Sequence, residues 1–481
     1  MNGAIGRLLR RAVYLREGEP LALLWSCAFF FLILSGYYVI RPIRDEMGVA
    51  AGVENLAYLF TGTLIGVLLI HPLYTSLVAR LPRRRFVPYT YRFFIVNLII
   101  FFFLFRSADA TQSVWIARVF FIWVSVLNLF IVSVFWSFMT DIYRTSQSKR
   151  LFGVVAVGGT LGATLGSMIT TSLVGLLGPI NLLLVSAIFL EMAAQTSRIL
   201  ERHEGRLAVA ALEDEREERV AGRSPQTEAG AAAERASERG KEVIGGGVFE
   251  GVHHVLRSPY LLGIAALVAM FAIVSTFLYF QVAAIVARVF EDDPVGRTRL
   301  FASRDLAVNV LTLGTQIFLT GRILRWLGIS VALAFLPAVS LIGFGILAAA
   351  PVLAVAIGFE ILRRSGNFAV QRPAREVLYT VLLRTDKYKA KNFNDTFVYR
   401  VGDQVGAWSY TAIGWLGIGL SGLAFTMVPV SAIWLLLAVW LGRKHRAIHH
   451  SQPVGVLPET VMETATGRIR ESARPAKSPL T

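Results

Sequence analysis

The sequence has one cysteine and few charged residues, and both shortages narrow the classes of protein that it can encode. Cys27 lies inside the first long apolar run, so neither a disulfide framework nor a thiolate metal site can form. Charged residues make up only 17% of the chain, against 55% hydrophobic residues, and the mean hydropathy is +0.58. Soluble domains do not have this balance. The composition therefore predicts a polytopic membrane protein and argues against redox chemistry.

The charge that is present is mostly positive, with a formal net charge of +16 over 481 residues. A strongly basic chain is typical of nucleic-acid-binding proteins, but here the basic residues collect in short segments between apolar runs. Positive loops of this kind mark the cytoplasmic side of a membrane protein. We therefore attribute the positive charge to loops on the cytoplasmic side of the membrane. The expected partners are the lipid bilayer and a small molecule, with no nucleic acid. The sequence leaves the oligomeric state open.

Long apolar runs fill most of the remaining sequence. A transmembrane helix needs about 17 to 25 predominantly apolar residues, and twelve windows meet this length or come close to it. They cover residues 20–40, 56–77, 87–105, 114–138, 151–177, 180–194, 260–286, 300–319, 329–349, 352–369, 396–420 and 423–441. The prediction is an all-α integral membrane protein with twelve transmembrane helices.

Basic residues collect in alternate connections between these spans, and the alternation sets the predicted orientation. The basic clusters lie at residues 80–85, 144–150, 322–325 and 384–391. The opposite connections are short and poor in lysine and arginine, or acidic, as at Glu291, Asp292 and Asp293. The positive-inside rule then places both termini in the cytoplasm. We expect a multi-pass protein of the cell inner membrane.

The spans divide into two halves of six, at residues 1–200 and 258–442. Residues 201–257 have the charged composition of a solvated cytoplasmic linker and end in an amphipathic helical pattern, and residues 443–481 are expected to form a disordered tail. A short segment recurs in the second half about 240 residues after its first occurrence. It reads R-T-S-Q-S-K-R-L-F at 144–152 and R-T-D-K-Y-K-A-K-N-F at 384–393. A parallel repeat of six spans around a central linker is the plan of the major facilitator superfamily.

Glycines recur at four-residue spacing after the first of these repeated segments, at Gly158, Gly162 and Gly166. The run G-G-T-L-G-A-T-L-G lacks the lysine and hydroxyl residue of a Walker loop, so no phosphate loop is indicated. Spacing of the G-x-x-x-G type instead lets membrane helices approach closely. Gly402 and Gly406 follow the second repeated segment in the same way. Neither a cofactor nor a metal site is predicted.

Charged residues stand at the far end of the first span, in G-Y-Y-V-I-R-P-I-R-D-E-M (36–47). Arg41, Arg44 and Asp45 share one helix face, and Pro42 should bend or end the helix. One interpretation is an anchor whose arginines reach the lipid headgroups. The other is a cationic substrate-binding site in a solvated cavity. Counted from Pro20, Arg41 lies about 31 Å along the helix axis, so such a site would be an outer vestibule.

Three later spans carry charged side chains, each of which costs about 2.5 to 3.5 kcal/mol or more inside a bilayer. They are Arg304 and Asp305 in the eighth span, Glu360, Arg363 and Arg364 in the tenth, and Arg400 and Asp403 in the eleventh. One interpretation is local ion pairs that lock helices together, such as Glu360 with Arg364 or Arg400 with Asp403.

In the functional interpretation, the arginines of these spans line a central cavity and bind substrate. Arg304, Arg364 and Arg400 would then join Arg41 and Arg44 in supplying positive potential. The carboxylates, Asp305, Glu360 or Asp403, would titrate or exchange partners during coupling or gating.

Three segments carry a resemblance to the bacterial and plastid ATP/ADP antiporter family of nucleotide transporters. Y-Y-V-I-R-P-I-R-D-E-M resembles its first-helix motif, in which Tyr-Asn-Ile-Leu-Arg precedes a basic residue and an Asp. F-W-S-F-M-T-D-I-Y-R-T-S-Q-S-K-R-L-F-G (135–153) is similar to its connection between the fourth and fifth helices. The stretch from Arg375 and Glu376 to Lys391 is similar to its later basic segment. Pro42 departs from the family, where an Asp follows the first Arg.

The resemblance implies a substrate-binding role for Arg41, Arg44, Asp45, Arg375 and Lys391. It also implies a secondary transporter of the major facilitator type that exchanges an anionic substrate, a nucleotide or a related phosphorylated compound, by alternating access. The alternatives are a proton-coupled permease for another solute and, from a different class, a membrane-embedded scaffold. An enzyme is not expected, because the sequence has no nucleophile–base or metal constellation.

Overall fold

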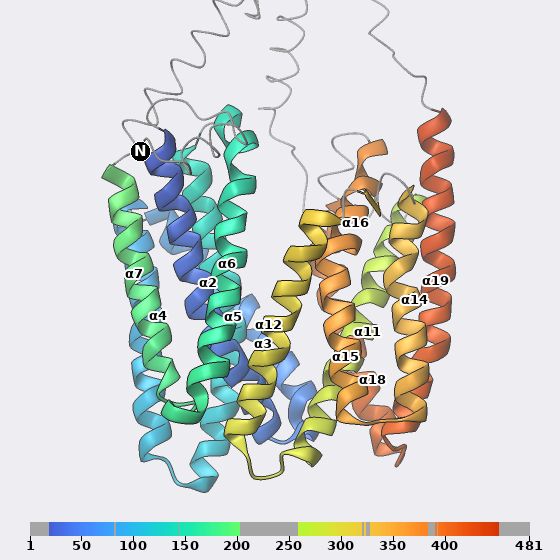
Figure 1. The fold of residues 1–481 in the computed structure, drawn as a ribbon, viewed down its shortest axis with the longest axis horizontal. Helices are drawn as coiled ribbons and strands as arrows, with labels where there is room; N and C mark the ends of the chain where they lie inside the picture. Colours follow the sequence, from blue (N-terminus) through green and yellow to red (C-terminus); the bar gives the residue numbers. More distant parts are fainter. Residues whose placement is uncertain are drawn as a thin grey trace, which may run out of the picture.

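The computed structural model describes residues 19–80, 83–143, 145–202, 258–319, 322–323, 328–382, 390–391 and 393–451. Nearly all of this backbone is helical (Figure 1). The segment before Glu19, most of the predicted linker 201–257 and most of the predicted tail 443–481 lie outside the described residues. The boundaries of the linker and the tail therefore stay predictions.

Each half of the chain contributes six long helical segments. In the first half they are α2 (Glu19–Ala50), α3 (Leu56–Arg80), α4 (Arg83–Ser107), α5 (Ala110–Ile142), α6 (Thr145–Leu177) and α7 (Leu182–Arg202), with the short turn η1 (Val53–Asn55) after α2. In the second half they are α11 (Pro259–Val289), α12 (Pro294–Phe318), α14 (Gly328–Ala349), α15 (Leu353–Gly366), α18 (Tyr399–Trp415) and α19 (Leu420–Ser451).

Two of the segments in the second half are extended by π-helical turns. The turn η2 (Asn367–Gln371) joins α15 to the short helix α16 (Arg372–Leu378), which ends in the turn η3 (Tyr379–Val381). The turn η4 (Asn394–Val398) leads directly into α18. A π-helical turn inserts an extra residue into a helix and is frequent at functional sites.

Among the described helices, nine are long and apolar enough to cross a membrane. The other three predicted spans correspond to α12, α15 and α18. Charged side chains interrupt α12, and α15 and α18 have only 14 and 17 residues of regular α-helix because π-helical turns adjoin them. The prediction of a twelve-helix, all-α membrane protein is confirmed.

Three predicted span boundaries differ clearly from the structure. The last span was expected to end at residue 441, but α19 continues to Ser451, into the first residues of the predicted disordered tail. The first span was expected to end at residue 40, but α2 continues through Pro42 to Ala50. An apolar window stops at the first charges, whereas here Arg41, Asp45 and Glu46 of α2 form ion pairs with oppositely charged residues of the other half and stay inside the protein. The sixth span, expected at 180–194, is the longer helix α7 of 21 residues.

The two halves lie side by side and have two distinct ends (Figure 1). We call the end that carries Glu19 and Ser451 the termini end, and the end formed by the short connections after α2, α4, α6, α11, α14 and α18 the loop end. The halves meet near the loop end and spread apart toward the termini end (Figure 1). Near the loop end, the Thr61 hydroxyl of α3 donates a hydrogen bond to Gln404 of α18 at 2.8 Å.

Glycines bring the first helix of each half into backbone contact with the fifth. A Cβ atom at Gly158, Gly162 or Gly166 of α6 would collide with the backbone of Cys27, Phe31 or Ser35 in α2. In the second half, a Cβ atom at Gly402 or Gly406 of α18 would press on the backbone of Ala269 or Ile273 in α11. The predicted packing role of these glycines is confirmed, and its recurrence in both halves agrees with the repeat.

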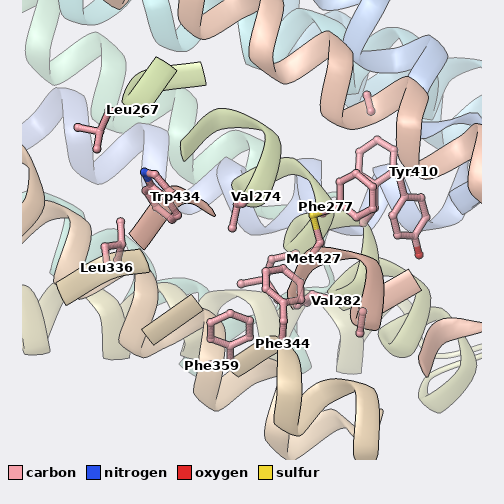
Figure 2. Close-up of a cluster of buried hydrophobic side chains, with 14 of the residues drawn as sticks. Leu267, Val274, Phe277, Val282, Leu336, Phe344, Phe359, Tyr410, Met427 and Trp434 are labelled. Carbon is pink, nitrogen blue, oxygen red and sulfur yellow. The ribbon is translucent and has the colours of Figure 1, made fainter. Parts of the chain in front are cut away.

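Away from the interface, apolar side chains fill each half. In the second half, Phe277, Phe344, Phe359, Tyr410 and Trp434 lie in one cluster between α11, α14, α15, α18 and α19 (Figure 2). Phe344 and Phe359 pack edge to face, with ring centroids 5.1 Å apart, an arrangement that aromatic rings prefer. This packing holds α15, and with it the charged side chains of α15, in a fixed position.

Candidate functional site

A polar cavity of about 240 Å³ lies between the two halves. Helices α2 and α3 line it from the first half, and α11, α12, α15, η2 and α18 line it from the second. Its charged lining consists of five arginines and three carboxylates: Arg41, Arg44, Arg304, Arg363 and Arg364 with Asp45, Glu360 and Asp403. The lining therefore carries an excess of positive charge.

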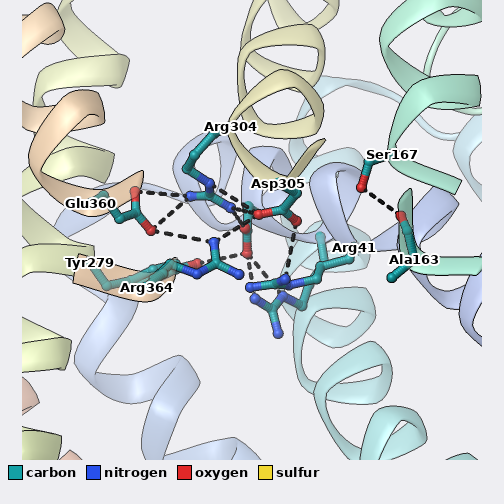
Figure 3. A network of polar contacts seen from close by, with 10 residues as sticks. Arg41, Ala163, Ser167, Tyr279, Arg304, Asp305, Glu360 and Arg364 are labelled. Atoms are coloured by element: carbon teal, nitrogen blue, oxygen red, sulfur yellow. Dashed lines mark hydrogen bonds and ion pairs between the residues drawn. The ribbon is translucent and has the colours of Figure 1, made fainter. Parts of the chain in front are cut away.

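Arg304 of α12 is the centre of an ion-pair network at this cavity (Figure 3). Its guanidinium is 2.6 Å from Asp45 of α2, 3.0 Å from Asp305 and 3.2 Å from Glu360 of α15. The side chain is only 1% exposed. One arginine thus holds carboxylates from three helices and from both halves of the chain, which its fork of five N–H donors makes possible.

Asp305 is the second centre of the network. Its carboxylate lies 3.2 Å from Arg41 of α2 and 2.7 Å from Arg364 of α15, in addition to Arg304. Arg364 also forms the predicted i,i+4 pair with Glu360, at 3.6 Å. Asp305 therefore joins α2, α12 and α15 at one point.

Arg44 and Asp45 complete the network on α2. The Arg44 guanidinium donates through Nε and Nη2 to the neighbouring Asp45 carboxylate, at 3.1 and 2.5 Å. The hydroxyl of Tyr279, from α11, donates to the same carboxylate at 3.2 Å. The network as a whole contains four arginines and three carboxylates, and it connects α2 with α11, α12 and α15.

The structure places this network deeper than the outer vestibule expected from the sequence. Because α2 reaches Ala50, Arg41 lies nine residues, or about 14 Å along the axis, from the loop end of the helix. Both arginines of the motif form ion pairs with carboxylates, Arg41 with Asp305 and Arg44 with Asp45. These contacts favour the cavity interpretation of the motif over the anchor interpretation.

A second buried ion pair joins the halves closer to the loop end, and the sequence analysis did not single it out. Glu46 of α2 and Arg297 of α12 lie 2.8 Å apart, with side chains 2% and 8% exposed. Arg297 also donates to the carbonyl oxygens of Phe290 and Glu291. Glu46 follows Asp45 directly in the R-D-E-M motif, but the expected helix end at residue 40 placed it outside the span.

The remaining predicted site residues lie apart from this network. Asp403 lines the cavity, pairs with Arg400 at 3.6 Å and accepts a hydrogen bond from Thr276 at 3.2 Å. Arg400 itself does not line the cavity. The two residues of the later basic segment, Arg375 and Lys391, lie at the termini end, where they pair with Asp395 at 3.3 Å and Glu376 at 2.6 Å.

Arg363 lines the cavity beside this network but was left out of the predicted substrate-binding set. Its side chain donates to the Ser275 hydroxyl at 2.6 Å and to the Phe271 carbonyl at 3.3 Å, both on α11. The guanidinium lies over the Phe271 ring, 5.2 Å from its centroid. The sequence signal for Arg363 was its place within the tenth apolar span, the same signal that identified Arg364.

Comparison with known proteins gives the fold of the chain. No protein-family model matches the sequence, and no curated protein matches it. Among solved structures, the chain is similar to PepTSo, a transporter of the POT family, with a TM-score of 0.58 and 14% identity over 90% of this chain and 99% of that one.

Two further solved structures are similar. An auto-inhibited peptide transporter of the POT family has a TM-score of 0.56 and 15% identity, over 95% of this chain and 99% of that one. A bacterial metal transporter has a TM-score of 0.54 and 10% identity, over 88% of this chain and 98% of that one. At this level of sequence identity, structural similarity is evidence for the fold alone. The chain has the all-α membrane fold of the major facilitator type, with two repeats of six helices.

Proposed function

We propose that this protein is a secondary transporter that moves an organic anion by alternating access, with a nucleotide or a related phosphorylated compound as the favoured cargo. The observation that carries the proposal is the arginine-rich cavity between the halves, together with the ion pairs that join those halves beside it. A membrane-embedded scaffold would not need such charges inside its helices, because each buried charge destabilises the fold unless it is compensated.

The cavity suits an anionic group rather than a complete large solute. Pockets for drug-sized ligands have volumes of about 300 to 1,000 Å³, and this cavity is smaller, at about 240 Å³. A phosphate or carboxylate would occupy it while the rest of the solute extends toward the termini end. Arginine binds such groups with two parallel hydrogen bonds, and the motif that contains Arg41 and Arg44 resembles that of the nucleotide transporters.

The network around Arg304 would link binding to the movement of the halves. Opening the loop end requires α2 to separate from α12 and α15, which breaks the contacts of Asp45 with Arg304 and of Arg41 with Asp305. A substrate anion that binds Arg41 or Arg44 competes with these carboxylates and replaces the lost counter-charge. This competition favours exchange of one substrate for another, because the positive charge of the arginines is neutralised either by the carboxylates or by substrate.

The termini end is proposed to be the cytoplasmic side of the cell inner membrane, since the basic loops predicted to face the cytoplasm adjoin it. The experiment that tests the function is uptake into proteoliposomes of labelled ATP, AMP, glucose 6-phosphate and inorganic phosphate. Each probe is measured with and without the same unlabelled compound inside. Uptake that depends on internal counter-substrate would support exchange, and absence of uptake for all four would reject the proposed cargo class.

A proton-coupled permease is the second candidate, because carboxylates line or adjoin the cavity. Asp403 lines it directly and is held by Thr276 and the half-exposed Arg400. Glu360 also lines it, and Asp305 contacts Arg41 and Arg364, which line it. An imposed pH gradient separates the two candidates: uptake that follows the gradient without internal substrate favours proton coupling through one of these carboxylates.

A further inference from the structure

Three arginines are buried among the described residues, and their partners differ. Arg297 pairs with Glu46, and Arg304 pairs with Asp45, Asp305 and Glu360. Arg363 is 4% exposed, yet no carboxylate of the described residues forms an ion pair with it. Arginine stays protonated in proteins, so this buried positive charge lacks a carboxylate in direct contact within the described part of the chain.

The hydrogen bonds of Arg363 are also incomplete. A guanidinium has five N–H donors, and the contacts with Ser275 and Phe271 both use Nη2. The Nε atom is buried and has no acceptor among the described residues. Buried donors without acceptors cost about 1 to 3 kcal/mol each, and more when the group is charged. The side chain therefore has both charge and donors available for an anion.

The nearest carboxylates are already occupied by other cations. Glu360, one helical turn before Arg363 on α15, contacts Arg304 and Arg364. Asp403, on the α18 side of the cavity, is paired with Arg400 and accepts from Thr276. By contrast, Arg41 and Arg44 must release a carboxylate before they can bind an anion. Arg363 can bind an anion without releasing a carboxylate. It is therefore the arginine of the cavity best placed to contact the substrate anion first.

The surroundings of Arg363 suit an apolar body attached to that anion. Phe271, Phe368 and Tyr399 line the same cavity, and the rings of Phe271 and Tyr399 are 6.1 Å apart. Phe368 belongs to the π-helical turn η2, and Tyr399 directly follows the turn η4. These irregular turns direct aromatic side chains of two helices to the cavity that Arg363 faces.

We propose that Arg363 and Ser275 form the primary anion subsite, where they bind the carboxylate or phosphate of an organic anion whose apolar part lies against Phe271, Phe368 and Tyr399. This inference rests on the proposed transport function and specifies the residues that first recognise the substrate. It assigns to Arg41 and Arg44 a later role, after their carboxylate contacts have opened.

The test begins with the purified full-length protein in detergent and no added ligand. Arg363→Met removes a buried charge that has no ion pair among the described residues and keeps an unbranched side chain, so its melting temperature should equal or exceed that of the wild type. Arg118→Met is the matched control, because Arg118 also stacks on an aromatic ring, Trp115, and donates to a backbone carbonyl, that of Ala51, but lies outside the cavity. A structural role of Arg363 predicts a clear loss of stability instead.

The second arm measures thermal stabilisation by benzoate, AMP and inorganic phosphate, with benzyl alcohol and adenosine as neutral counterparts. Benzoate or AMP should stabilise the wild type and the Arg118→Met control, whereas the neutral compounds should not. Arg363→Met should lower the apparent affinity at least tenfold. Arg363→Lys, which keeps the charge but loses the fork, and Ser275→Ala should show smaller losses.

In the ligand measurements, either of two results would overturn the inference. One is a wild-type protein that responds to none of the three anions, and the other is an Arg363→Met protein that responds as the wild type does. Proteoliposome uptake that is unchanged by Arg363→Met would reject this subsite while leaving the transport function in place. Absence of uptake together with Arg363-dependent stabilisation would keep the subsite and reject transport of that probe.

Discussion

At the scale of single residues, Arg304 shows why arginine rather than lysine is required at a junction of helices. Its nitrogens contact Asp45, Asp305 and Glu360 through different edges of one planar group. An ammonium group is a compact charge on a flexible stem and cannot contact three carboxylates in this arrangement. Each of the three carboxylates also pairs with another arginine, but Arg304 is the residue of the network that contacts all three of them.

Arg304→Lys should therefore destabilise the protein although it keeps the charge. Removing one partner of a buried ion pair costs about 3 to 5 kcal/mol, and the retained ammonium should recover part of this. Thermal unfolding can be followed by the reaction of the half-buried Cys27 with a thiol-reactive fluorophore. Arg118→Lys, at the half-exposed site beside Trp115, should change stability by no more than about 0.5 kcal/mol. Equal effects of the two substitutions would contradict the role given to Arg304.

At the scale of helices, α2 and α6 form the closest helix pair of the first half because glycines remove the side chains between them. In a bilayer, lipid tails are as apolar as leucine, so association depends on close contact rather than on burial from water. Ser35 strengthens the pair by donating to the carbonyl of Gly162 at 3.2 Å. The same helix carries Arg41 and Arg44 farther along, so this packing also fixes the position of the network.

Gly162→Ala should separate α2 from α6 and lower stability by about 1 to 3 kcal/mol, because an added methyl group would overlap the backbone of Phe31. Gly153→Ala, on the same helix, is the control, since its Cβ would meet no atom within 4 Å. That substitution should be neutral or slightly stabilising, as alanine favours helix more than glycine does. The Cys27 unfolding assay compares both variants, and a Gly162→Ala protein as stable as Gly153→Ala would rule out close packing at this position.

How far the sequence predicts the structure depends on the range of the interaction. Helix positions and the packing role of the glycines were predictable, because apolar windows and four-residue spacing are local patterns. The pairs Glu360 with Arg364 and Arg400 with Asp403 were also predictable, since their partners share a helix. Asp45 and Arg304 are 259 residues apart, and no local pattern identifies which carboxylate meets which arginine.

The functional places of Arg363, Glu46 and Arg297 were not predictable from the sequence, for related reasons. Arg363 differs from Arg364 only in what surrounds it, and burial without a partner is a tertiary property. Glu46 was assigned outside the first span because charge ended the apolar window, although compensation by Arg297 lets α2 continue. The π-helical turns η2 and η4 have no sequence signature, so the aromatic side chains that they direct to the cavity could not be assigned to it.

At the scale of the whole molecule, the proposed orientation can be tested with residues at the two ends. In a Cys27→Ser background, Asp292→Cys lies at the loop end and Lys444→Cys near the termini end, and both positions are exposed. With the termini end in the cytoplasm, an impermeant thiol reagent should label position 292 in intact cells and position 444 only after permeabilisation. The reverse pattern would invert the proposed orientation.

The closed loop end can be tested through the buried pair between Glu46 and Arg297. Glu46→Gln keeps the size of the side chain but removes the charge, so the contact between α2 and α12 should weaken and conformations open at the loop end should become more populated. Because Glu46 does not line the cavity, a direct effect on substrate contacts is not expected.

The readout is a cysteine at Asn367, which lines the cavity, in the Cys27→Ser background. With an intact ion pair, an impermeant reagent added to whole cells should label this position slowly, and inside-out vesicles should label quickly. Glu46→Gln should raise the labelling rate in whole cells severalfold and lower it in vesicles. A molecule that opens at the loop end leaves the conformation that is open at the termini end, so the two rates change in opposite directions. Glu54→Gln, at an exposed carboxylate of the loop end, is the control and should leave both rates unchanged. If Glu46→Gln changes neither rate, the pair contributes to stability alone, and closure of the loop end must depend on the network around Arg304.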